Sequence, residues 1–244
     1  MFYPSYFWFL GPILLCMLFA MMANSKVRSS FAKYDQVRIR SGLTGYDTAV
    51  RLMQSNGVRG ISIGTVSGTL TDHYHPAKAV VNLSESTYNR SSVAAVAVAA
   101  HEMGHVMQKQ QGYLFYRFRT ALVPVVNFGT RLALPLVLVG LLLDGFSRTA
   151  SSDTGFYIAM VGVVLYGGSL LFALVTLPVE LDASRRARTM LLETGILTQE
   201  EVPGAKKVLS AAALTYLASV LTSLVYFVRF LFQVLFLFGR RSNR

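Results

Sequence analysis

Long apolar runs separated by polar stretches dominate the pattern of this chain. The first run, residues 6–23, has no charged side chain, and basic residues follow it rather than precede it. Further runs extend over about 120–143 and 156–177. A helix needs about 20 apolar residues to cross a bilayer, and a signal peptide would carry its basic residues first. The pattern therefore predicts an uncleaved anchor and a transmembrane hairpin.

The last apolar stretch, residues 208–238, is long enough for a fourth span. Because Arg229 interrupts it and a basic tail follows, we expect either one helix or a helical hairpin. Arg131 lies near the middle of the second span, where an arginine is costly and often functional. We expect its side chain to face other helices and to pair with a carboxylate or with backbone carbonyls.

The polar stretch between the first two spans contains shorter elements. Thr44 can cap a helix over 46–56, and a longer helix is expected from about 92 to 111. Residues 61–66 and 79–83 have the composition of short strands. These elements indicate a small α+β domain. The predicted organisation is an anchor at 1–23, this segment at 24–119, the hairpin at 120–178, a helix at 179–209 and the apolar C-terminal region at 210–244.

Composition supports a membrane protein and excludes some kinds of site. Hydrophobic residues make up 53% of the 244 residues and charged residues only 14%, against about 25% in a typical soluble domain. Lipid is therefore expected to solvate part of the chain. The single cysteine, Cys16, excludes an intrachain disulfide and a zinc–cysteine cluster.

The net charge of +11 indicates contact with lipid. We find no nucleic-acid-binding motif, and the basic residues cluster beside apolar segments, so no nucleic-acid partner is expected. Twelve Lys and Arg residues lie in 24–119 and five in 180–210, whereas the loop 144–155 has one and the N-terminus has none. Under the positive-inside rule both basic segments are cytoplasmic and would contact anionic lipid.

The residues His101, Glu102 and His105 form the motif that carries chemistry. Histidines four residues apart project from one face of a helix and can bind one Zn²⁺ ion through imidazole nitrogens. Glu102 lies beside that face, where it can take a proton from a zinc-activated water and pass it to the leaving amine. The alternative, a solvated helix turn, is disfavoured by the apolar residues 93–100, which bury the approach to the motif.

A catalytic zinc normally has three protein ligands and one open position. Candidates for the third ligand are Glu180, Asp182, His73, His75 and Asp144. Asp144 would suit a site-2-type intramembrane protease, but one span, about 30 Å, separates it from the motif. Glu180 and Asp182 follow the third span on the motif's own side, and Pro178 suits the first turn of a new helix there. Gly104 leaves room for close packing of the helix that bears this ligand.

Four segments together are distinctive and cover nearly the whole chain. They are Leu70-Thr71-Asp72-His73-Tyr74, Ala99-Ala100-His101-Glu102-x-Gly104-His105, Ala121-Leu122-Val123-Pro124-Val125-Val126-Asn127-Phe128-Gly129 and Glu180-x-Asp182-Ala183-Ser184-Arg185-Arg186. With them the chain resembles the YugP-like neutral zinc metallopeptidases of bacterial membranes. More distantly it is similar to HtpX-type membrane peptidases and to the CAAX prenyl-protease relatives.

The resemblance implies that Glu180 is the third zinc ligand, as in gluzincins. The aspartate that the relatives place four residues later usually steadies a zinc-bound histidine, and Ser184 occupies its position here. Ser184 or Asp182 is therefore expected to take that role. Arg185 and Arg186 would stabilise the oxyanion or bind lipid headgroups.

The resemblance also implies how substrate binds. The segment 79–83, taken as an edge strand, would bind an extended peptide by strand addition. His73 and His75 precede it and would either help to hold the substrate or transition state, or shape the turn at Pro76.

We therefore expect a mainly α membrane protein with three or four transmembrane helices and a small α+β, zincin-like cytoplasmic metallopeptidase domain, located in the bacterial plasma membrane. Its expected activity is zinc-dependent endopeptidase hydrolysis of membrane or membrane-proximal proteins. Two alternatives stay open. A non-catalytic, zinc-stabilised membrane scaffold or adaptor would not need Glu102, and a site-2-type intramembrane protease would use Asp144.

Overall fold

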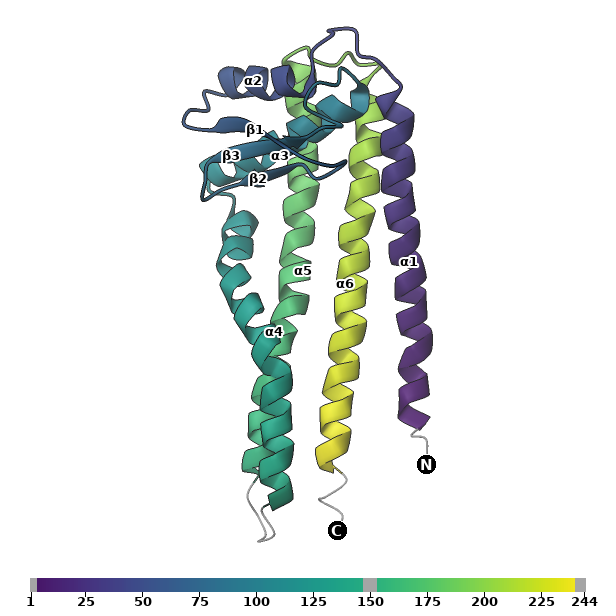
Figure 1. The fold of residues 1–244 in the computed structure, drawn as a ribbon, viewed down its shortest axis with the longest axis vertical. Coiled ribbons are helices and arrows are strands. Elements are labelled where there is room, and N and C mark those ends of the chain that lie inside the picture. Colours follow the sequence, from purple (N-terminus) through teal and green to yellow (C-terminus); the bar gives the residue numbers. More distant parts are fainter. Residues whose placement is uncertain (1–3, 147–152, 240–244) are drawn as a thin grey trace. The chain divides into compact units, whose positions relative to one another are not determined.

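The chain forms six helices and a three-stranded sheet over residues 4–146 and 153–239, the part that the computed structural model describes (Figure 1). Side chains are described for 8–143 and 153–238. The helices are α1 (Pro4–Asp35), α2 (Gly45–Ser55), α3 (Val93–Gln110), α4 (Leu114–Phe146), α5 (Thr154–Glu193) and α6 (Val202–Gly239). The strands are β1 (Ser62–Val66), β2 (His73–His75) and β3 (Val80–Ser84).

Four helices, α1, α4, α5 and α6, are long and apolar enough to cross a membrane. This confirms the expected mainly α membrane protein with a small α+β part. The chain divides into two compact units. The helix unit comprises Met1–Ala20, Phe118–Leu177 and Leu217–Arg244, and the mixed unit comprises Met21–Arg117 and Pro178–Tyr216. Each of the four long helices therefore contributes residues to both units.

The long helices extend beyond the apolar runs that predicted them. α5 continues through Pro178 to Glu193, so the prediction of a new helix beginning near Pro178 is wrong. A proline inside a helix removes one amide donor, and the turns on both sides can still hold the helix together. α6 is one helix from Val202 to Gly239, so the single-helix alternative holds for the C-terminal region and the hairpin does not.

The mixed unit contains the sheet, with strand order β1-β3-β2 (Figure 1). β1 runs parallel to β3, and β2 runs antiparallel to β3 with Tyr74 opposite Val81. β3 is therefore central, and the prediction that segment 79–83 is an edge strand is wrong. The two edge strands are β1 and β2, and β2 has three residues, too few for its side-chain alternation to be recognised in the sequence.

One face of the sheet packs against α2 and α3. Val81 and Leu83 of β3 are fully buried in one cluster with Leu52 of α2 and Met103 of α3. Tyr74 of β2 packs against the same cluster. Because side chains alternate across a strand, the residues on either side of Tyr74 project from the opposite face of the sheet.

Side-chain caps fix the beginnings of α2 and α3. The Thr44 hydroxyl accepts a hydrogen bond from the Asp47 amide at 3.1 Å, and the Asp47 carboxylate accepts one from the Thr44 amide at 2.9 Å. This reciprocal box satisfies two amide donors at the helix start. At α3 the Ser92 hydroxyl accepts from the Ala95 amide at 3.2 Å. Both predicted helix starts are confirmed, and α3 carries the metal motif.

In the helix unit, α4 and α5 approach closely at small residues. A Cβ added at Gly162 would lie 2.6 Å from the carbonyl oxygen of Ala133, and one at Gly140 would lie 2.3 Å from that of Gly155. Small residues permit such contacts between membrane helices. Arg131 lies two residues before Ala133 and hence about 200° around α4. Its side chain is exposed, so it does not face the other described helices of this chain, contrary to expectation.

Candidate metal centre

Two histidines of α3 meet one glutamate of α5 within the mixed unit. Nε2 of His101 lies 3.1 Å from Oε2 of Glu180, and Nε2 of His105 lies 3.3 Å from the same oxygen. The possible ligand atoms all lie within 4.8 Å of one another, and no side chain of the three is more than 13% exposed. Two imidazoles and a carboxylate thus form one compact, nearly buried group.

Gly104 lets α3 and α5 approach closely beside this group. A Cβ at Gly104 would lie 2.6 Å from the carbonyl oxygen of Ala183 and 3.1 Å from its Cα. Any side chain there would push α5 away from α3. This confirms the expectation that Gly104 makes room for the helix that bears Glu180.

The donor set and its spacing fit zinc. Zn²⁺ binds histidine nitrogen and carboxylate oxygen at about 2.0–2.2 Å in tetrahedral geometry, which places any two ligand atoms about 3.3 Å apart. The two nitrogen–oxygen distances of 3.1 and 3.3 Å agree with this spacing. Three protein ligands leave a fourth position for water or substrate, as in catalytic rather than structural zinc sites.

Glu102 adds a second buried carboxyl group beside the first histidine. It is 7% exposed, and burial raises the pKa of its carboxyl group although the imidazoles of His101 and His105 oppose the rise. Burial lowers the pKa of His105, but the hydrogen bond with Glu180 and the charges of both glutamates outweigh it, so that pKa is raised overall. The pKa values of Glu102 and His105 are therefore both raised, the first mainly by burial and the second by the neighbouring carboxylates.

A buried amide determines the tautomer of His105. Gln108 is fully buried, and its Nε2 donates to the carbonyl oxygen of Val179 at 2.7 Å and to Oδ2 of Asp182 at 3.0 Å. Oε1 of Gln108 therefore faces Nδ1 of His105, at 2.9 Å. An amide carbonyl oxygen can only accept a hydrogen bond, so the proton between these two atoms belongs to the imidazole. Nδ1 must then carry a ring proton, which leaves Nε2, the nitrogen nearest Glu180, as the atom that would bind a metal ion.

Ser184 and Asp182 reach different histidines. Oγ of Ser184 lies 3.2 Å from Nδ1 of His101. Asp182 reaches His105 only through Gln108, and its carboxylate also accepts from Arg185 at 2.7 Å and from Arg186 at 2.5 Å. The two arginines thus hold Asp182 in place, and the side chain of Arg185 is otherwise 71% exposed.

Comparison with known proteins agrees with this geometry. A family model described as "Putative neutral zinc metallopeptidase" matches residues 8–235. The chain belongs to this family. "Putative membrane protease YugP" of Bacillus subtilis (strain 168) is 42% identical over 221 residues, which cover 91% of this chain and 93% of that relative. No solved structure matches the chain.

These matches confirm the resemblance stated from the sequence. The four apolar helices and the membrane relative together make this zinc metallopeptidase a membrane protein. Its family description implies zinc, the ion that the group of His101, His105 and Glu180 fits.

Other candidate ligands in this zinc metallopeptidase lie elsewhere. His73 and His75 flank Tyr74 on β2 and therefore project from the sheet face opposite to α3. Each is engaged locally, since Nδ1 of His73 lies 2.9 Å from a backbone carbonyl oxygen and Nδ1 of His75 accepts from a backbone amide at 3.2 Å. The side chain of Asp144 lies outside the described residues.

Gln108 is the site residue that motif and composition did not reveal. Its position three residues after His105 places it on the same face of α3, which is the available sequence signal. Tyr116 is a second addition, 7% exposed with its ring centroid 6.3 Å from that of His105.

Proposed function

We propose that this protein is a zinc-dependent endopeptidase that hydrolyses peptide bonds of membrane or membrane-proximal proteins. His101, His105 and Glu180 bind one zinc ion, and Glu102 is the general base. The observation that carries the proposal is the approach of two histidine nitrogens to one buried glutamate oxygen at 3.1 and 3.3 Å, beside a second buried carboxyl group. The descriptions of the family and of the membrane relative support the reaction class and the setting.

The chemistry divides between the metal and the chain. Zinc would supply Lewis acidity: it would lower the pKa of a bound water to about 7 and polarise a peptide carbonyl. Glu102 takes the proton of the attacking water and delivers it to the leaving amine. Gln108 and Ser184 hold the rings of His105 and His101 through their Nδ1 atoms, so that both Nε2 atoms point to the same place.

An extended substrate would bind along β2. This strand forms an edge of the sheet, where an added peptide strand gains main-chain hydrogen bonds, whereas the central β3 already has a strand on each side. Nε2 of His73 lies 3.1 Å from Nδ2 of Asn82 on the outer sheet face. In this proposal His73 and His75 contact substrate side chains and do not bind metal, and Arg185 steadies Asp182.

The charge distribution supports a cytoplasmic site. The basic segments 24–119 and 180–210 contain all the proposed metal ligands, and the positive-inside rule assigns such segments to the cytoplasm. Their basic side chains would contact anionic lipid headgroups there.

The decisive experiment compares wild type with Glu102→Gln, purified in lipid nanodiscs. Zinc content is measured together with cleavage of labelled casein and of lipid-anchored fluorogenic peptides. We expect Glu102→Gln to keep one zinc per chain and to lose cleavage by about 100-fold or more, because a general base contributes that much. Glu85→Gln, which changes an exposed glutamate of the same unit, is the matched control and should cleave as wild type does.

Two outcomes would refute the proposal. If Glu102→Gln keeps its zinc and cleaves at the wild-type rate, Glu102 is not the base. If zinc-loaded wild type cleaves none of these substrates, the protein is better described as a zinc-stabilised membrane scaffold. Glu180→Gln tests the ligand set separately, and retention of zinc in this variant together with its loss in Asp144→Asn would favour a site-2-type protease.

A further inference from the structure

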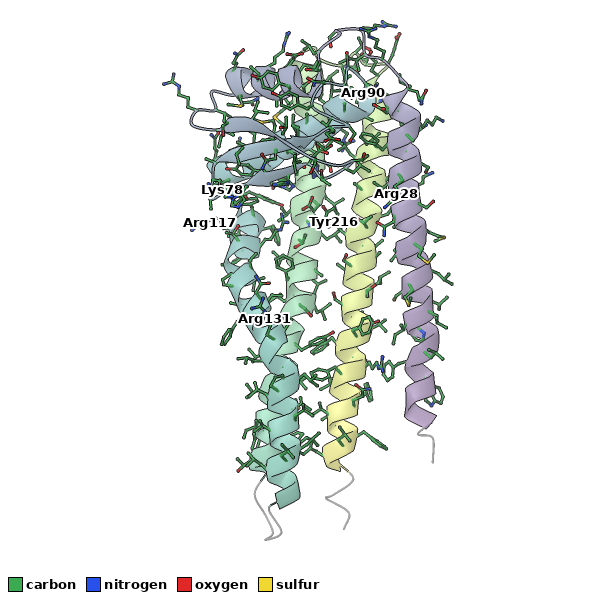
Figure 2. The ribbon with its side chains drawn as sticks, in the orientation of Figure 1. Arg28, Lys78, Arg90, Arg117, Arg131 and Tyr216 are labelled. Carbon is green, nitrogen blue, oxygen red and sulfur yellow. The ribbon has the colours of Figure 1, made fainter. Side chains whose placement is uncertain are left out.

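α4 carries an arginine deep within its membrane-spanning segment. Arg131 lies twelve residues after Arg119 and fifteen before Phe146, where α4 ends. At 1.5 Å per residue these separations are about 18 Å and about 22 Å, so Arg131 lies near the middle of a hydrocarbon layer of about 30 Å. Figure 2 labels Arg131 on α4, and its side chain is exposed there.

Asn127 extends this polar feature along the helix. It precedes Arg131 by four residues, which places both side chains on one face of α4, and it too is exposed. Among the described side chains, neither Asn127 nor Arg131 has a hydrogen-bond or ion-pair partner. We call these two residues the α4 polar face.

The helix unit contains no carboxylate that could neutralise Arg131. Its sequence has two acidic residues, Asp144 and Asp153. Asp144 follows Arg131 by thirteen residues, about 20 Å along the same helix, and Asp153 lies beyond the end of α4. A second copy of this chain would bring the same two residues, so it too would lack an acid at the level of Arg131.

We propose that the α4 polar face binds the transmembrane helix of another protein that carries a carboxylate within its span. Charged side chains inside a bilayer are costly and pair with one another. A carboxylate can accept two parallel N–H bonds from a guanidinium, and the Asn127 amide one turn away can add an interhelical hydrogen bond. Snorkelling to lipid phosphates is the competing arrangement, but an extended arginine side chain covers only part of about 18 Å.

The test uses synthetic transmembrane peptides and the full chain. Leucine-rich peptides with one central Glu or Gln at the level of Arg131 are added to the labelled protein in phosphatidylcholine vesicles at pH 8, and association is followed by energy transfer. We expect the Glu peptide to bind wild type about tenfold more tightly than the Gln peptide. Arg131→Leu should remove this preference for the Glu peptide, whereas Arg131→Lys, which keeps a positive charge, should retain part of it.

Controls separate the carboxylate from other effects. Val125→Ala alters an exposed, uncharged position on a different side of α4 and should keep the preference. Moving the Glu to the end of the peptide should abolish it. Zinc content and circular dichroism establish that each variant is folded, so a misfolded Arg131→Leu is recognised and replaced by Arg131→Gln.

Three results would overturn the proposal. The first is equal binding of the Glu and Gln peptides to wild type, which leaves lipid as the acceptor. The second is a Glu preference that survives in folded Arg131→Leu. The third is energy transfer between two labelled copies of this chain that is lost in Arg131→Leu, which would make the α4 polar face a self-association surface.

Discussion

Gln108 is the residue on which the orientation of His105 depends. Replacing it with leucine removes the acceptor of the Nδ1 proton and leaves Val179 and Asp182 without their shared donor. We expect Gln108→Leu to weaken zinc binding by about 10–100-fold, measured by competition with a chelator. Gln110→Leu, at an exposed position on the same helix, should bind zinc as wild type does. Equal affinities of the two variants would show that the amide does not position the ligand.

Individual site residues could be predicted wherever residue type and local spacing are sufficient. His101, Glu102 and His105 are one turn of one helix, and Glu180 was added through the family resemblance. Gln108 could not be found in this way, because the partners that give it a role lie 71 and 74 residues later. The role of the Gln108 amide can be recognised only in the folded structure, where α3 lies against α5.

The capping box of α2 gives a pH-dependent prediction for a single element. Hydrogen bonds from the Thr44 hydroxyl and amide hold the pKa of Asp47 below its ordinary value. A lowered folded-state pKa stabilises the fold above the unfolded-state pKa of about 3.9, and this stability is lost as pH falls through the folded-state pKa. Asp47→Ala should therefore lower the free energy of unfolding by about 0.5–1 kcal/mol at pH 7.

Denaturant titrations of wild type and Asp47→Ala at several pH values measure this difference. It should shrink as pH falls below about 4, because wild type then loses the carboxylate that the variant lacks. A difference that stays constant from pH 7 to pH 3 would mean that the charge of Asp47 does not contribute.

Elements with local signals were predicted well, and those defined by distant partners were not. Thr44 and Ser92 mark helix starts in the sequence itself. The strand order β1-β3-β2 depends on which segments pair, so the central position of β3 had no local signal. In the same way Pro178 suggested a helix start, whereas α5 passes through it without a break.

The arrangement of the whole chain across the membrane can be tested with single cysteines. In a Cys16→Ser background, Lys78→Cys and Asp153→Cys place one thiol at exposed positions on the two sides of the α4 span. A membrane-impermeant maleimide should label Asp153→Cys in intact bacterial cells and Lys78→Cys only after permeabilisation, because basic segments stay in the cytoplasm. The reverse labelling pattern would place the metal motif outside.

The positions of the proposed ligands on α3 and α5 also set the order in which the metal centre can form during synthesis. His101 and His105 leave the ribosome before α4 and α5, whereas Glu180 follows the apolar part of α5. In the proposed centre, the nascent chain therefore lacks the third ligand until the apolar parts of α4 and α5 have been translated. Under the proposed ligand set, a soluble fragment that ends before α4 would carry His101 and His105 without Glu180.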